Sequence, residues 1–158
     1  MKDMSSNDLT PIDSLVNIPT YKAGVAQSTA YRLLKKFTEE AIAPYGLTMM
    51  HWFIIGTVYD AGDIGIGVTE LSKAVDTNVP YITNTLNLLE QKGMVTRETR
   101  KGDNRAKFVT IAPGYLHTVE TIESELRQTM RDTIYSRITP AELRIYITVL
   151  YKLADSLN

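Results

Sequence analysis

Five basic residues cluster within eleven positions near the middle of the chain. They are Arg97, Arg100, Lys101, Arg105 and Lys107, out of seventeen lysines and arginines in the whole sequence. Apolar and polar side chains alternate on either side of residues 102–104, which predicts a β-hairpin over residues 94–111. Cations held on such a hairpin can neutralise DNA phosphates. Taken alone, the pattern fits a solvated surface hairpin equally well.

The segment before the hairpin, residues 79–91, has the pattern of an amphipathic helix. Its apolar residues recur at spacings of three, four and three: Val79, Ile82, Leu86 and Leu89. This spacing predicts one buried stripe. The polar side is predicted to carry Tyr81, Asn84, Thr85 and Asn87, with Thr83 alongside. Asparagine can form two hydrogen bonds with adenine, and threonine can contact a thymine methyl. The predicted DNA contacts of this helix and its cap are Thr77, Asn78, Pro80, Tyr81, Thr83, Asn84 and Asn87.

The hairpin residues divide into two predicted roles. We expect Arg105 to enter the minor groove, with Asp103 orienting it through a charge-assisted hydrogen bond. The remaining cations fit phosphate contacts, which position a protein without specifying bases: Arg97, Arg100, Lys101 and Lys107. Asn104 completes the predicted contact set at the turn. A helix that exposes amides beside a basic hairpin indicates a winged helix-turn-helix that binds double-stranded DNA.

Helical patterns occupy most of the rest of the chain. They are predicted at residues 21–43, 49–60, 68–75, 113–137 and from 140 to the end, with a short strand at 65–67. Thr48 is suited to cap the helix at 49–60, and Thr139 with Glu142 forms a capping box for the last helix. Gly93 is expected to end the helix at 79–91. The predicted fold class is therefore mainly α.

Two features of these helices predict how the domain is organised. The helix at 49–60 is apolar on nearly all sides, so we expect it at the centre of the fold. The outer helices, 21–43 and 113–157, carry apolar stripes larger than one small domain can cover, which favours a homodimer joined through them. We predict a single domain over residues 20–158, with a DNA-binding lobe at about 47–112.

Composition excludes several classes of protein. The chain has 158 residues, no cysteine and a net charge of −1. Disulfides, thiol catalysis and thiolate metal sites are therefore excluded, and any DNA binding must come from local clusters of charge. Residues 1–19 are polar, contain two prolines and are interpreted as an N-terminal extension. No apolar run is long enough to span a membrane and no signal-peptide core is present, so we expect a cytoplasmic protein without membrane contact.

Candidate catalytic and metal-ligating residues are few. His51 and His117 are the only histidines, and they lie about 66 positions apart with no carboxylates that pair with them. Ordinary packing or surface histidines fit this pattern better than a metal site. No serine, histidine and acid motif and no glycine-rich phosphate loop is present. We therefore predict neither an enzyme nor a cofactor.

Several short motifs follow one another along the chain. They are Gly46–Leu47–Thr48 with Trp52, Val68–Thr69–Glu70–Leu71–Ser72, Ile82–Thr83–Asn84, Leu89–Glu90–Gln91–Lys92–Gly93–Met94–Val95, and Asp103–Asn104–Arg105 with Val109 and Ile111. Together they resemble the MarR family of winged helix-turn-helix regulators, over roughly residues 21–157. Asn84 and Asn104 depart from this pattern, because the family often has arginine there, and His51 occupies a common glutamine position. The resemblance implies a homodimeric, DNA-binding transcription regulator, often relieved by a small aromatic or phenolic ligand.

A ligand site is expected between the dimerisation helices and the DNA-binding lobe. Its predicted lining is Tyr31, His51, Trp52, Ile55 and Tyr59, although aromatic residues at helical spacing also fit a packed core. We predict a repressor of a pseudo-palindromic operator, with phenolic acids as the first ligands to test. The alternative is a winged-helix protein-interaction module without specific DNA binding. The basic hairpin argues against that alternative.

Overall fold

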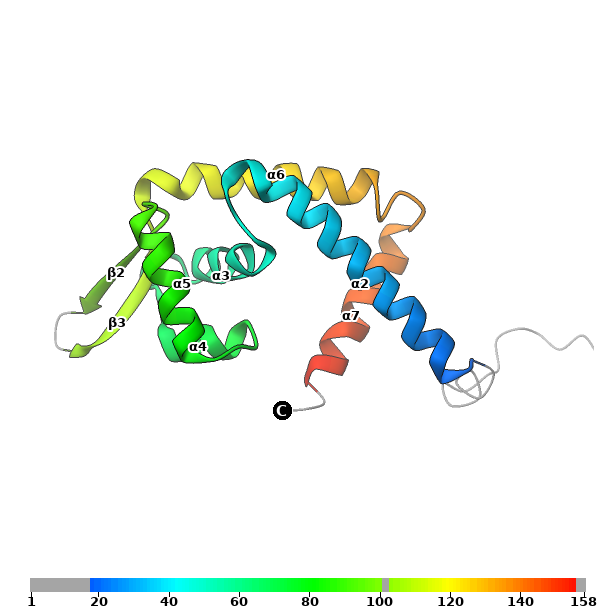
Figure 1. Cartoon of the computed structure of the whole chain (residues 1–158), viewed down its shortest axis with the longest axis horizontal. Helices are drawn as coiled ribbons and strands as arrows, with labels where there is room; N and C mark the ends of the chain where they lie inside the picture. Colours follow the sequence, from blue (N-terminus) through cyan, green and yellow to red (C-terminus); the bar gives the residue numbers. More distant parts are fainter. Residues whose placement is uncertain (1–17, 101–102, 156–158) are drawn as a thin grey trace, which may run out of the picture. The chain divides into compact units, whose positions relative to one another are not determined.

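The computed structural model describes residues 18–100 and 103–155, without the side chains of Arg100 and of residues 103–106. Most of the predicted N-terminal extension, residues 1–17, therefore lies outside the described residues. Figure 1 follows the described chain from helix α2 to helix α7. Among these residues no single helix is long and apolar enough to cross a membrane.

Helix α2, Thr20–Ile42, crosses the boundary between two units of the chain, Met1–Lys36 and Phe37–Asn158. In the first unit, every described residue except Leu34 is exposed. Buried side chains begin in the second unit, with Thr38 and Ile42. The helix ends in a short 3₁₀ turn, Ala43–Tyr45, followed by Gly46 with a φ of 68°.

Helix α3, Met49–Asp60, begins and ends where the sequence predicts. Five of its side chains are buried: Met49, Trp52, Ile54, Ile55 and Val58. Thr48 caps it, because its Oγ1 accepts a hydrogen bond from the His51 backbone N–H at 3.3 Å. Helix α3 contacts helices α4 and α6 and strand β3, which places it in the core of the second unit.

The helix-turn-helix is formed by α4, Val68–Ala74, and α5, Val79–Gln91. Asp76 in the turn between them adopts a φ of 51°, a left-handed conformation that aspartate tolerates better than most residues. Helix α5 ends in a Schellman motif: the Gly93 N–H donates to the Glu90 carbonyl and the Met94 N–H to the Leu89 carbonyl, both at 2.9 Å. The predicted bounds of α5 and its stop at Gly93 are confirmed.

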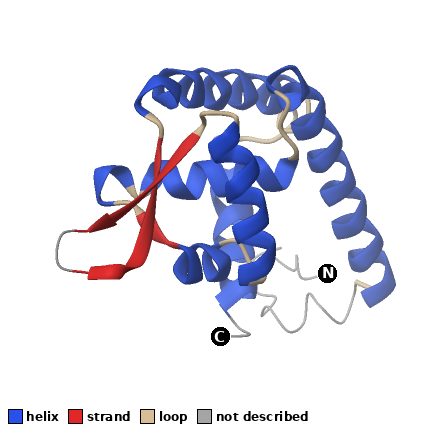
Figure 2. Ribbon diagram, turned by 60° about the vertical axis from the view of Figure 1, so that its left-hand side comes forward, coloured by secondary structure: helices blue, strands red, loops and turns tan. Residues whose placement is uncertain are grey.

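Three antiparallel strands form the wing and its support (Figure 2). They are β1, Ile66–Gly67, β2, Val95–Arg100, and β3, Asp103–Ile111, in the order β1–β3–β2. Val109 of β3 is central, since it pairs with Ile66 on one side and Arg97 on the other. The predicted hairpin is confirmed, and strand β2 contacts helix α5.

The C-terminal helices are α6, Leu116–Asp132, and α7, Pro140–Asp155. The single helix predicted at 113–137 is wrong at both ends. Residues Pro113–Tyr115 form a 3₁₀ turn, and the helix stops at Asp132. At the stop, Thr133 departs from helical geometry with a ψ of −77°, and its hydroxyl donates to the Thr129 carbonyl at 2.6 Å. The capping box of α7 is confirmed, with the Thr139 N–H donating to Glu142 Oε2 at 2.8 Å.

Two glycines with positive φ allow a test of the contact between β3 and the segment before β1. Gly65 and Gly93 both have a φ of 70°. A Cβ at Gly65 would lie 2.8 Å from the Val109 carbonyl oxygen and 2.9 Å from Thr110 Cγ2, whereas a Cβ at Gly93 would meet no atom within 4 Å. Left-handed strain costs an alanine about 1–2 kcal/mol at Gly93. Gly65, with a ψ of 173°, lies in a region that is almost exclusive to glycine, so its backbone strain is at least as large. Crowding should add roughly 1–3 kcal/mol at Gly65 alone.

We therefore expect Gly65→Ala to lower the free energy of unfolding by more than Gly93→Ala. Urea titrations of the two variants and the wild type, at one protein concentration, measure the difference. Equal losses at the two positions would show that the approach of Gly65 to β3 relaxes without cost.

Candidate nucleic-acid interface

Helix α5 exposes a row of amides. Asn84 and Asn87 are exposed, and they lie opposite the buried side chains Ile82, Leu86 and Leu89. This arrangement agrees with the polar face predicted from the sequence. Tyr81 extends this face toward the start of the helix, with 40% of its surface exposed.

Two residues of α5 lie on the other face from the one predicted. Thr85 was placed on the polar face but is 7% exposed. It follows Ile82 by three residues and precedes Leu89 by four, so helical geometry puts it within the buried stripe. Val79 was placed in the stripe but is 39% exposed. The buried stripe consists of Ile82, Thr85, Leu86 and Leu89, and Val79 lies at its edge.

The first turn of α5 uses part of its polar groups internally. Asn78 Oδ1 accepts the Tyr81 backbone N–H at 2.9 Å, which makes Asn78 the helix cap. The Thr83 hydroxyl donates to the Val79 carbonyl at 2.9 Å. Asn78 and Pro80 are exposed, and Thr77 is half-buried. The cap therefore stabilises the start of the helix, and the Asn78 oxygen is already occupied by the Tyr81 N–H.

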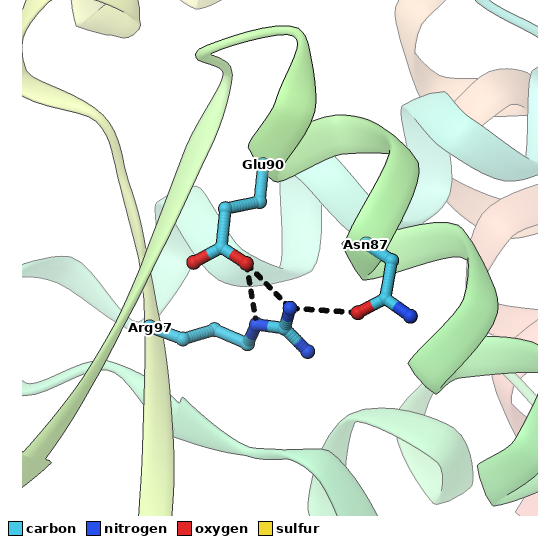
Figure 3. Close-up of polar contacts among 3 residues, drawn as sticks. All are labelled: Asn87, Glu90 and Arg97. Carbon is cyan, nitrogen blue, oxygen red and sulfur yellow. Dashed lines mark hydrogen bonds and ion pairs between the residues drawn. The ribbon is translucent and has the colours of Figure 1, made fainter.

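A polar cluster joins the wing to α5 (Figure 3). Arg97 on β2 donates through Nε to Glu90 Oε2 at 3.0 Å, and one of its terminal nitrogens forms an ion pair with the same oxygen. That terminal nitrogen also donates to Asn87 Oδ1 at 2.7 Å. The Arg97 side chain is 17% exposed and that of Glu90 39%. Arg97 thus has two partners on helix α5, whereas its predicted role is a phosphate contact.

The ion pair sets the charge state of Glu90. The hydrogen bond from Arg97 holds the pKa of the Glu90 carboxyl below its ordinary value, with partial burial opposing this effect. Because the pKa of Glu90 is lower in the folded protein than in the unfolded chain, the ion pair stabilises the fold at any pH above the ordinary carboxyl pKa. This stabilisation is lost as the pH falls through the lowered pKa of Glu90. The cluster is therefore ionised at neutral pH.

The remaining wing residues are described to different extents. Lys107 is exposed on β3, opposite Thr99. The side chains of Arg100, Asp103, Asn104 and Arg105 lie outside the description, as does Lys101 altogether. Their predicted contacts with phosphate and the minor groove stay predictions.

An open cavity of about 980 Å³ lies beside the helix-turn-helix, within the second unit. It is lined by α3 from Trp52 to Asp60, by the turn at Ala74–Asp76 and by α6 from Val119 to Arg127. Its charged residues are four carboxylates and one guanidinium: Asp60, Asp76, Glu120, Glu123 and Arg127. The Tyr59 hydroxyl donates to Glu120 at 3.1 Å, and Arg127 donates to Glu123 at 2.6 Å. The cavity is therefore aromatic on one side and acidic on the other.

Residues 47–107 match the model of the MarR family. This part of the chain is similar to MarR family regulators. The match includes helices α3 to α5, strand β2 and the first part of strand β3, and it confirms the resemblance predicted from the sequence motifs.

Solved structures share the fold of this region and its flanking helices. AbsC, a MarR family transcriptional regulator from Streptomyces coelicolor, is 20% identical with a TM-score of 0.76, over 94% of this chain and 96% of that chain. A MepR–DNA complex from S. aureus is 20% identical with a TM-score of 0.71, over 84% and 96%. A mutant MarR from E. coli complexed with operator DNA is 20% identical with a TM-score of 0.72, over 82% and 91%. The mainly α winged helix-turn-helix predicted from the sequence is confirmed.

The five predicted pocket residues lie in different places. Trp52 and Tyr59 line the cavity. Ile55 is fully buried in the core, and Tyr31 is exposed on α2 in the first unit. His51 completes the cap of α3, since its Nδ1 accepts the Thr48 N–H at 3.2 Å. Burial, followed by the nearby Lys92, lowers the pKa of His51, which favours the neutral ring that this bond requires.

Sequence reasoning missed the acidic residues around these sites. Glu90 has a signal, because it follows Asn87 by three residues and so shares its helix face beside the basic hairpin. Glu120 and Glu123 lie on the side of α6 that borders the cavity. Helical periodicity alone does not distinguish this side from one that faces bulk solvent. Among the residues that the structure describes, no group of three or more histidines and carboxylates could hold a metal ion.

Proposed function

We propose that this protein is a homodimeric transcriptional repressor that binds a pseudo-palindromic operator. The observation that carries the proposal is the exposed amide row of α5, with Asn84 and Asn87, bonded through Arg97 to a basic wing. A helix of this kind presents donors and acceptors to base edges in the major groove, while wing cations neutralise phosphates.

Similar proteins support DNA as the partner. The MepR structure from S. aureus and the mutant MarR structure from E. coli are complexes with DNA, and AbsC is described as a transcriptional regulator. A repressor is the simplest mode of action, because a dimer covering two half-sites occupies DNA that other proteins need. The rival function is a protein-interaction module. It leaves unexplained why exposed amides and cations, which suit a polyanion such as DNA, lie side by side.

An apolar face on α7 supports the homodimer. None of the sixteen residues of this helix is buried. Ile145, Val149 and Leu153 recur at intervals of four, so they share one face, and they are 64%, 46% and 53% exposed. Apolar side chains that remain exposed in one chain are typical of a surface that a second copy covers. On α2, Tyr21 and Val25 are 68% and 62% exposed. These apolar side chains of the first unit are also suited to contact with a second copy.

The cavity supports a ligand that releases the DNA. Trp52, Phe53 and Tyr59 offer ring surfaces to a small aromatic molecule. The four carboxylates repel an anion, and the one guanidinium in the lining is already paired with Glu123. The cavity therefore fits an aromatic cation better than the phenolic acids predicted from the sequence. Such a ligand changes DNA affinity only as far as it binds one dimer state more tightly than the other.

The first prediction concerns base recognition. DNA selected from a random library by the full-length protein should contain two inverted half-sites, centred about one helical turn apart. Asn84→Ala should weaken binding to this DNA by roughly 1–3 kcal/mol and relax the preference at one position in each half-site. Lys107→Ala is the control, because losing a phosphate contact should weaken all sequences alike and reduce the slope of log affinity against log salt by about one. Fluorescence anisotropy at several salt concentrations measures both effects, and a wild-type protein that enriches no sequence would exclude specific binding.

The second prediction concerns assembly. Replacing both Ile145 and Val149 with glutamate should convert the dimer to monomers, because four buried charges at a two-fold interface cost more than the apolar contact provides. Arg144→Glu, an exposed position outside this face, should leave the dimer intact. Analytical ultracentrifugation at micromolar concentration distinguishes the two species. A wild-type monomer, or a dimer that survives the double substitution, would contradict this interface.

The third prediction concerns the ligand. Benzyltrimethylammonium should bind the protein more tightly than benzoate, as measured by isothermal titration calorimetry. The double variant Glu120→Gln/Glu123→Gln should bind the cation about threefold to tenfold more weakly, since partly exposed charge pairs contribute up to about 1 kcal/mol each. Asp63→Asn, an exposed acid outside the cavity lining, is the matched control. Tighter binding of benzoate would show that charge does not select the ligand.

A further inference from the structure

Asn87 lies where helix α5 meets the wing, and one edge of its amide already has a partner. The Arg97 guanidinium donates to Asn87 Oδ1 at 2.7 Å. A guanidinium carries only donors, so the amide atom that faces it must be the oxygen. The oxygen and nitrogen lie on opposite sides of the planar amide. The NH₂ group therefore turns away from Arg97, as Figure 3 shows.

Arg97 is itself held in place by Glu90. Its Nε lies 3.0 Å from Glu90 Oε2, and a terminal nitrogen contacts the same oxygen. Glu90 and Asn87 lie three residues apart on one helix face, so both ends of the contact come from a rigid element. To reach a phosphate, the guanidinium would have to leave two partners and a position in which its side chain is only 17% exposed.

We propose that Arg97 is a positioning residue, which holds the Asn87 amide so that its NH₂ group donates to an acceptor on a base edge. This inference rests on the DNA binding proposed above and adds a role within it. It replaces the phosphate contact predicted for Arg97. It also gives Asn87 and Asn84 different tasks on the same helix face.

The fixed amide selects a class of base. An asparagine that rotates freely recognises adenine by donating through its NH₂ group and accepting through its oxygen. With Oδ1 bonded to Arg97, the edge of Asn87 that faces away from the wing carries donors. In the major groove, guanine presents two acceptors, O6 and N7, whereas cytosine presents an amino donor. Adenine and thymine offer one acceptor each, N7 and O4, so guanine, which offers two, is the base expected opposite Asn87.

The first test changes the edge that Asn87 presents while keeping its anchor. Asn87→Asp has nearly the same shape, and a carboxylate accepts the Arg97 hydrogen bond at least as well. The outward edge then carries an acceptor in place of a donor. Selection from a random DNA library should show guanine opposite this position with the wild type and loss of that preference, by about fivefold to a hundredfold, with the variant. The urea midpoint of unfolding should not fall, which separates this effect from loss of structure.

The second test changes the anchor. Arg97→Lys keeps the charge but cannot bond Glu90 and Asn87 together through a planar fork. It should relax the same guanine preference as Asn87→Asp does and leave other positions unchanged. The double variant Glu90→Gln/Arg97→Gln removes the ion pair without leaving one charge alone. It should leave the slope of log affinity against log salt unchanged, whereas the control Lys107→Ala should lower that slope by about one.

The outcomes separate this inference from the proposed function. If the wild type enriches no DNA sequence, the proposed function fails. If the wild type enriches an operator but Asn87→Asp and Arg97→Lys keep its guanine preference, the positioning role is wrong. A salt slope reduced by about one in the Glu90→Gln/Arg97→Gln variant would instead identify Arg97 as a phosphate contact.

Discussion

Helix α3 is apolar on nearly every side, so it is stable in water only when several other elements cover it together. Helices α4 and α6 and strand β3, which come from distant parts of the sequence, provide that cover. Ile54, Ile55 and Val58 are fully buried as a result. Burying each such side chain contributes about 1.5–3 kcal/mol. This packing fixes α4, and through α4 and β3 it also fixes the recognition helix and the wing.

Apolar packing sets the distance between α5 and the wing, and a polar cluster sets the orientation of the groups that face outward. Leu89 of α5 and Val95 of β2 are buried, while Arg97 crosses to Glu90 and Asn87 at the half-exposed edge of the same contact. Ion pairs at such edges contribute at most about 1 kcal/mol to stability. Their larger effect here is geometric, because a guanidinium with two partners restricts the rotamers of all three side chains.

Caps, stops and apolar spacing in the sequence predicted most of the helices and strands. They did not predict the side-chain contacts between those elements. The bounds of α3 and α5 followed from Thr48, from a cap at Thr77 or Asn78, and from Gly93, because caps and stops act within one turn. The end of α6 was missed because Ile134 continues the apolar spacing beyond the point where Thr133 bonds the backbone. The partners of Arg97 and the acidic lining of the cavity depend on tertiary approach. The spacing of residues within one segment does not show which residues of another segment will lie beside it.

The polar groups of the candidate interface serve the fold first, and this limits what remains for DNA. The Asn78 oxygen caps α5, and the Thr83 hydroxyl bonds the helix backbone. Because an unsatisfied backbone N–H at the cap would destabilise the helix, the Asn78 oxygen is poorly suited to reading bases. An asparagine has a donor edge and an acceptor edge, so the bond from Arg97 that occupies the oxygen of Asn87 leaves its donors in place. The bond from Arg97 thus orients the amide of Asn87, with its donor edge directed away from the wing.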